Sequence, residues 1–110
     1  MATAARTVNA LLDQLSDAGP LTARKMFGEY ALYLDGRVVA LVCDDLLYVK
    51  PTPGALALLP DNPMAPPYPG AKPHLLIDAA LDDQELMAVV LRRVAQEVAP
   101  PKPRKARRLD

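Results

Sequence analysis

The segment RKMFGEYALYLDGRVVALV, residues 24–42, carries the strongest structural signal in the chain. Apolar side chains alternate on both sides of the dipeptide Asp35-Gly36. Asp-Gly is a frequent pair in two-residue hairpin turns, because a type I′ turn needs positive φ at both central positions. The segment therefore predicts two antiparallel strands, residues 26–34 and 37–43, joined by a tight turn.

The predicted register of this hairpin places Leu34 opposite Arg37, Leu32 opposite Val39, Tyr30 opposite Leu41 and Gly28 opposite Cys43. The second strand is apolar on both of its faces. A strand with one face in water alternates apolar and polar residues, so the pattern predicts that a helix or a second subunit covers the second face. Residues 46–50 extend the meander as a third strand.

Two amphipathic segments flank the meander. In residues 7–19 and 83–98, apolar residues recur at three- and four-residue spacing, which predicts helices. The stripes consist of Val8, Leu11, Leu12 and Leu15 in the first, and of Leu86, Val89, Val90, Val94 and Val98 in the second. Gly19-Pro20 ends the first helix. The fold class predicted is α+β: a two-layer arrangement with an antiparallel β-meander flanked by N- and C-terminal helices.

Eight of the twelve prolines lie between residues 51 and 73. Thr52 and Pro53 favour a short helix, with threonine as its cap and proline at its first position. The residues after it predict a surface loop, because each proline removes a backbone donor and fixes φ. Residues 74–81 predict one more short strand, near an edge of the sheet.

Length and charge set the domain organisation. The 110 residues, 51% of them hydrophobic, suit one domain over residues 1–98. The net charge is zero, yet the last ten residues carry +4. Residues 99–110 are therefore predicted to be a disordered basic tail. Its candidate nucleic-acid contacts are Lys102, Arg104, Lys105, Arg107 and Arg108.

Few chemistry-bearing residues are present. Cys43 is the single cysteine and His74 the single histidine, so a Cys–His nucleophilic pair could be formed only by these two residues. Cys43 lies among valines and leucines, where a free cysteine behaves as a small hydrophobe. Scattered carboxylates lack metal-ligand spacing. The sequence therefore predicts no enzyme, no metal and no cofactor. No apolar run spans a membrane and no signal peptide is visible, which predicts a cytoplasmic protein without membrane contact.

Residues 24–50 resemble the start of the N-terminal domain of the TfoX/Sxy family of bacterial proteins, whose recurring pattern is R-K-M-F-G-x-Y-x-L-Y-x-D-G-x-x-F-A-L-V followed by L-Y-x-K. The resemblance covers about Leu21 to Val98 and is strongest over its first thirty residues. The matching positions are Arg24, Lys25, Met26, Phe27, Gly28, Tyr30, Leu32, Tyr33, Asp35, Gly36, Ala40, Leu41, Val42, Leu47, Tyr48 and Lys50. Val39 replaces an aromatic residue of the pattern, and the proline run replaces a polar-aromatic strand. The resemblance implies a compact α+β domain and a link to competence regulation.

Two function classes follow. In the first, the chain is a non-enzymatic regulatory or interaction domain that binds protein, including a second copy of itself as a homodimer. In the second, it is an accessory protein that binds nucleic acid weakly and non-specifically through the basic tail and Arg24-Lys25. The candidate contact surface is the entrance of the segment, Arg24, Lys25, Phe27 and Gly28.

Overall fold

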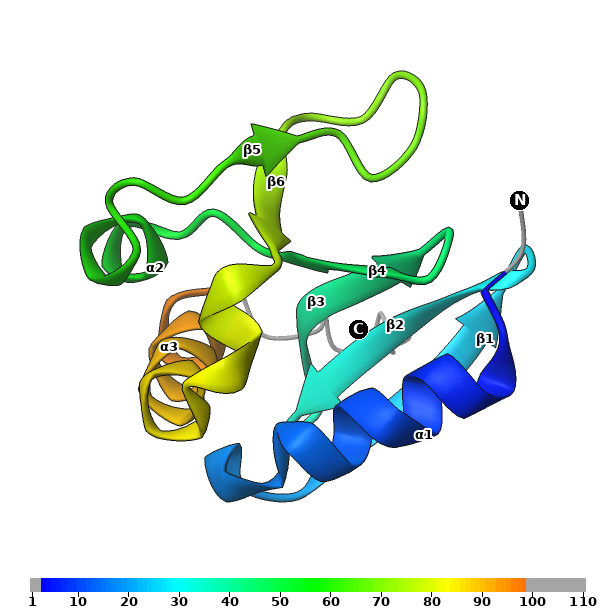
Figure 1. Cartoon of the computed structure of the whole chain (residues 1–110), viewed down its shortest axis with the longest axis horizontal. Coiled ribbons are helices and arrows are strands. Elements are labelled where there is room, and N and C mark those ends of the chain that lie inside the picture. The colour runs from blue at the N-terminus through cyan, green and yellow to red at the C-terminus, as the bar shows by residue number, and fades with distance from the viewer. Residues whose placement is uncertain (1–2, 99–110) are drawn as a thin grey trace, which may run out of the picture.

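A computed structural model describes residues 3–98. These residues form a six-stranded antiparallel sheet with helices from both ends of the chain (Figure 1), which confirms the predicted α+β class. The helices are α1 (Ala5–Gln14), α2 (Pro53–Leu58) and α3 (Gln84–Glu97), with short 3-10 segments η1 (Ser16–Ala18) and η2 (Ala79–Asp82). The strands are β1 (Leu21–Met26), β2 (Glu29–Leu34), β3 (Arg37–Cys43), β4 (Leu46–Val49), β5 (Met64–Ala65) and β6 (His74–Ile77), in the order β1-β2-β3-β4-β6-β5.

Three two-residue turns join the first four strands. Their φ values are +52° and +82° at Phe27-Gly28, +57° and +77° at Asp35-Gly36, and +54° and +63° at Asp44-Asp45. Positive φ at both positions is the signature of a type I′ turn, which matches the twist of the flanking strands. The turn at Asp35-Gly36 is confirmed as predicted.

The prediction of one continuous strand over residues 26–34 is wrong. The chain turns at Phe27-Gly28, and residues 21–26 form the additional strand β1, which pairs with β2. Gly28 therefore lies in a turn rather than opposite Cys43. The sequence signal was weak because phenylalanine, unlike Asn, Asp or Gly, has no preference for positive φ.

The register between β2 and β3 contains an irregularity. Leu34 pairs with Arg37 as predicted, but Leu32 pairs with Ala40 and Tyr30 with Val42. The shift between Leu32 and Tyr33 leaves Val39 as an extra residue, which is the pattern of a β-bulge. The predicted pairs Leu32–Val39 and Tyr30–Leu41 are wrong by one residue, because the bulge moves Val39 to the helix-covered face.

The main core lies between the sheet and the helices. Figure 1 shows α1 running along β1 and β2, with α3 beside it. The largest fully buried side chains are Leu15, Leu32, Leu75, Met87, Leu91, Val39, Val42, Val49, Val90 and Val94. In α3 the predicted Val90 and Val94 are buried, but Val89 is 40% exposed. Met87 and Leu91 lie in the core instead, which rotates the buried stripe relative to the prediction.

The second face of the sheet has a smaller apolar cluster. Ala31, Leu41, Cys43 and Tyr48 are buried there. No helical residue belongs to this cluster within residues 3–98. Of the two covers predicted for this face, a helix is therefore not found on the described part of the chain, and a second subunit stays a prediction.

Side-chain caps begin α2 and α3, and the cap predicted at Thr52 is confirmed. Thr52 caps α2 by accepting a hydrogen bond from the amide of Ala55 at 3.3 Å, with proline in the first turn. Asp83 caps α3 by accepting from the amide of Leu86 at 3.0 Å. The proline-rich loop contains the two-residue edge strand β5, so β6 lies second from that edge. No helix in residues 3–98 is long and apolar enough to span a bilayer.

Candidate functional site

Large apolar side chains are exposed at one end of the sheet. Phe27 is fully exposed at 101%, and Met26, Leu46 and Tyr68 are exposed by 42–54%. Met26 pairs with Glu29 and Leu46 pairs with Cys43, so the β1–β2 and β3–β4 turns lie at the same end. Figure 1 shows these turns and the β5–β6 loop, which carries Tyr68, on the same side of the molecule. Met26, Phe27, Leu46 and Tyr68 are called the hairpin-end patch.

A pocket of about 460 Å³ opens in this patch. Its lining consists of Met26, Phe27, Glu29, Tyr30, Leu41, Cys43 and Tyr68. Leu41 and Cys43 are buried and belong to the second-face cluster. Aromatic and aliphatic groups dominate this lining, and a concave apolar site of this kind suits an apolar side chain of a partner. We call it the hairpin-end pocket.

Residues near the N-terminus hold the two turns together. The Thr3 hydroxyl donates to Glu29 Oε1, which also accepts from the amide of Asp44 at 3.1 Å. The amide of Thr3 donates to the carbonyl of Gly28 at 3.1 Å. These bonds connect the β1–β2 turn to the β3–β4 turn, so the position of the patch is set by backbone groups on both sides.

Asp45 provides a further tie at the same end. Its Oδ1 accepts from the amide of Ala4 at 2.9 Å. This bond, followed by a hydrogen bond with the Thr7 side chain, lowers the pKa of the Asp45 carboxyl. Asp45 therefore stays ionised at neutral pH, and together with Asp44 it gives the β3–β4 turn a negative charge.

Cys43 does not have the properties of a nucleophile. Burial, and then the charge of Glu29, raise the pKa of its thiol, so the thiol stays protonated at neutral pH. Cys43 pairs with the first residue of β4, whereas Leu75, next to His74, pairs with the last. The register thus places Cys43 and His74 at opposite ends of β4, roughly 10 Å apart along the strand direction alone.

His74 is the first residue of β6, the strand predicted over residues 74–81, and its side chain is buried. Its Nδ1 lies 2.8 Å from the carbonyl oxygen of Lys72. Nε2 has no hydrogen-bond partner in the part of the chain that the structure describes. Over the same residues there is no group of three or more His, Cys, Asp or Glu side chains that could hold a metal ion.

The structure brings the predicted contact residues to the same end of the sheet but on different sides. Arg24 lies on the second face, with its guanidinium carbon 5.9 Å from the ring centroid of Tyr33. Lys25 lies opposite Tyr30, which packs against the main core. Phe27 and Gly28 form the turn itself.

Sequence reasoning missed two members of the patch, Leu46 and Tyr68. The sequence places Leu46 in the third strand but does not predict that it lies exposed at the same end of the sheet as Phe27. Tyr68 belongs to the proline-rich loop, and no local pattern predicts which part of the sheet that loop reaches. The predicted tail contacts, Lys102, Arg104, Lys105, Arg107 and Arg108, lie outside the described residues.

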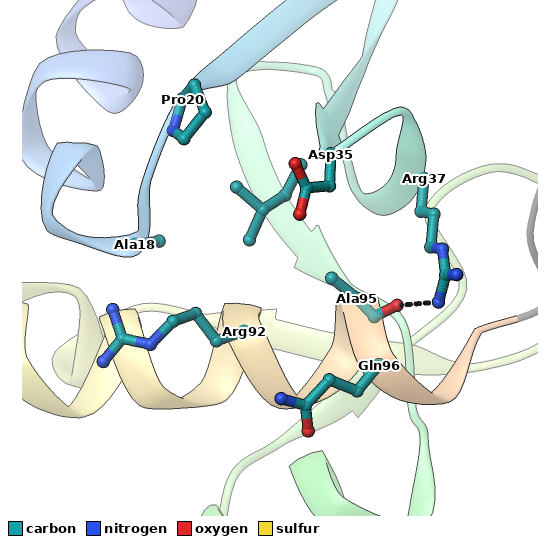
Figure 2. A pocket seen from close by; sticks show the side chains of 8 residues that line it. Ala18, Pro20, Asp35, Arg37, Arg92, Ala95 and Gln96 are labelled. Atoms are coloured by element: carbon teal, nitrogen blue, oxygen red, sulfur yellow. Dashed lines mark hydrogen bonds between the residues drawn. The ribbon is translucent and has the colours of Figure 1, made fainter.

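A second pocket of about 390 Å³ lies at the other end of β2 and β3, against the C-terminal half of α3. Figure 2 shows Arg37 reaching the carbonyl oxygen of Ala95, a bond of 2.8 Å. Arg92 donates to the carbonyl of Asp17 at 2.9 Å. A cation beside the last turn of a helix satisfies carbonyls that lack an intrahelical partner. These arginines therefore have a structural role in joining α3 to the sheet and to η1.

The chain is similar to a known domain family and to a known protein. Residues 13–98 match the TfoX N-terminal domain. The chain is also 36% identical over 107 residues to a Spirochaeta aurantia protein named "Uncharacterized 12.7 kDa protein in trpE 5'region". That similarity covers 97% of this chain and 93% of the relative. The chain belongs to the TfoX N-terminal domain family.

Proposed function

We propose that the protein is a non-enzymatic regulatory domain that binds another protein through the hairpin-end patch. The observation that carries the proposal is Phe27, a fully exposed aromatic residue at φ +52°. Family membership supports a regulatory role, and the resemblance to TfoX extends this role to the control of competence.

Phe27 is unfavourable in the isolated domain in two respects. A non-glycine residue with positive φ is disfavoured by roughly 1–2 kcal/mol, and phenylalanine lacks the polar side chain that compensates in Asn or Asp. Its ring is also entirely in water. Binding a partner would bury the ring, and exposed aromatic residues beside a pocket are typical centres of protein interfaces.

The geometry favours protein binding over nucleic-acid binding by the sheet. Single-stranded nucleic acid needs aromatic faces that are free to stack on bases. Tyr30 packs against the main core, and Arg24 lies over the face of Tyr33. Phe27 is fully exposed beside the basic pair Arg24-Lys25, but it is a single free ring and not the row of aromatic faces on which successive bases stack.

The test uses Phe27→Asn, which gives the turn the favoured dipeptide Asn-Gly and removes the ring. Tagged parent, Phe27→Asn and Val89→Ala proteins are expressed in native cells, and captured proteins are quantified by mass spectrometry with and without nuclease. Val89→Ala is the matched control, because Val89 is an exposed apolar residue on α3.

We expect the parent and Val89→Ala to retain the same partners and Phe27→Asn to lose them, independently of nuclease. Partners that persist at parent level with Phe27→Asn would contradict the proposal. Partners that disappear only after nuclease treatment would instead support the accessory nucleic-acid function.

A further inference from the structure

We infer that the partner bound at the hairpin-end patch is a second copy of this chain, arranged about a two-fold axis. This inference rests on the proposed function and specifies the partner of the same surface. In a two-fold dimer one patch contacts its own duplicate, so the patch must be complementary to itself in shape and in charge. The described residues meet both conditions.

Shape is the first condition. The patch contains a protruding group, the Phe27 ring at the tip of the β1–β2 turn. Beside it lies the hairpin-end pocket, whose buried part is formed by Leu41 and Cys43 on β3. A two-fold axis that passes between the ring and the pocket places Phe27 of each copy over the pocket of the other. Both rings are then buried by one symmetric contact.

Charge is the second condition. Arg24 is exposed on β1, on the Phe27 side of the patch and on the same face of the sheet as Leu41 and Cys43. Asp44 is exposed in the β3–β4 turn and directly follows Cys43, which lines the pocket. When each Phe27 occupies the other copy's pocket, β1 of one copy lies over the β3–β4 turn of its partner. The same rotation therefore brings Arg24 of each copy opposite Asp44 of the other.

An unrelated partner could bind this domain through the Phe27 ring alone or through the pocket alone. The presence of a protruding ring and a pocket, and of both signs of charge, on the same end of one small domain favours the second copy. Four paired strands, β1 to β4, support this surface. Their last pairs at this end are Met26–Glu29 and Cys43–Leu46. A rigid surface of that kind loses little conformational entropy on association.

Association is measured first, on the full chain, by sedimentation equilibrium from micromolar to near-millimolar concentration. The parent is expected to form a concentration-dependent dimer. Phe27→Asn is expected to weaken the dimer about 30-fold or more, the loss typical of a central aromatic contact. Because this variant should fold at least as stably as the parent, its dissociation cannot be assigned to unfolding. Val89→Ala should dimerise like the parent.

A charge exchange tests the symmetric arrangement. In a dimer of Arg24→Asp, the introduced carboxylate faces Asp44 of the other copy, and the like charges repel. In a dimer of Asp44→Lys, the introduced ammonium group faces Arg24 of the other copy, and the like charges again repel. Each variant alone is therefore expected to be monomeric. Mixed at equal concentration, they should form a heterodimer, because both contacts become attractive. Asp61→Lys, which makes the same charge change in an exposed loop residue, is the control and should dimerise like the parent.

Three outcomes would overturn the inference. They are a parent that stays monomeric throughout, a dimer unaffected by Phe27→Asn, and variants that fail to associate when mixed although circular dichroism shows both folded. A monomeric parent that still captures protein partners through Phe27 would leave the proposed function standing with a different partner. A dimer that Phe27→Asn does not weaken, together with unchanged capture of partners by that variant, would contradict both.

Discussion

At the scale of single residues, the β1–β2 turn contains a residue, Phe27, whose positive φ lowers stability and whose exposed ring is available for contact. Phe27 and Gly28 both have positive φ, and the glycine adopts that conformation freely while the phenylalanine does not. Phe27→Asn should raise the free energy of unfolding by up to about 1 kcal/mol, because asparagine is tolerated at positive φ. Urea denaturation of the two proteins measures the difference. A less stable variant would show that the Phe27 ring already stabilises the single chain.

Gly28→Val tests the second residue of the same turn. Gly28 has φ +82°, and a β-branched side chain at positive φ is strongly disfavoured. We expect a loss of about 1–2 kcal/mol in the free energy of unfolding. Gly28→Asn should lose less, because its side chain is not branched at Cβ. Equal stability of the valine variant and the parent in a urea melt would refute the assigned role of this glycine.

At the scale of elements, α2 and α3 meet at Gly54. The amide of Gly54 donates to Glu97 Oε1 at 2.8 Å. A Cβ at this position would lie 2.8 Å from Cδ of Arg93 and 2.7 Å from Oε2 of Glu97, closer than side chains ordinarily approach. The glycine is therefore required by the close approach of the two helices.

Gly54→Ala should lower the free energy of unfolding by about 1–3 kcal/mol through this overpacking. The double variant Gly54→Ala/Arg93→Ala should recover part of the loss, because it removes the crowded Cγ and Cδ atoms of Arg93. A double-mutant cycle in urea measures the coupling. If the changes in the free energy of unfolding of the two single variants add up to that of the double variant, the crowding is relieved by movement of α3 away from α2 and not by displacement of the Arg93 side chain.

At the scale of the whole molecule, carboxylates tie distant segments together. Hydrogen bonds from Thr52 and then from the amide of Gly54 lower the pKa of Glu97, and the amide of Ala4 has the leading effect on Asp45. A folded-state pKa below the unfolded value, about 4 for these groups, means that the unfolded chain binds protons more tightly. Their contribution to stability is thus present above about pH 5 and is lost as the pH falls through the folded-state values.

We therefore expect the urea midpoint of the parent to be constant near neutral pH and to fall below about pH 5. Asp45→Asn keeps an oxygen acceptor for Ala4 and suits the positive φ of this position, but it cannot titrate. Combined with Glu97→Gln, it should make the decline at acidic pH shallower. Superimposable acid profiles of the parent and the double variant would exclude these two carboxylates as its source.

The basic tail, residues 99–110, carries the candidate nucleic-acid contacts of the chain. If residues 99–110 bind nucleic acid, their affinity should fall steeply with salt, because each phosphate contact releases counterions. A chain ending at residue 98 should then lose DNA binding while its melting temperature stays unchanged. Fluorescence anisotropy with duplex DNA at two salt concentrations measures this. Retained affinity in the shortened chain would remove the tail from consideration.

The parts of the fold that were predictable from sequence are those encoded within a few residues. Asp35-Gly36 determines its turn through backbone φ, and Thr52 and Asp83 determine helix starts through caps that span three residues. Helix periodicity places Val90 and Val94 in the core for the same local reason.

Tertiary structure alone decided the rest. The bulge at Val39 reverses which face its side chain covers, and it depends on how β2 and β3 pair rather than on either strand. The hairpin-end pocket gathers Phe27 from the β1–β2 turn, Cys43 from the end of β3 and Tyr68 from the proline-rich loop. No local preference links such residues. Their proximity results from strand order and from the path of the proline-rich loop, which are set by packing across the whole domain.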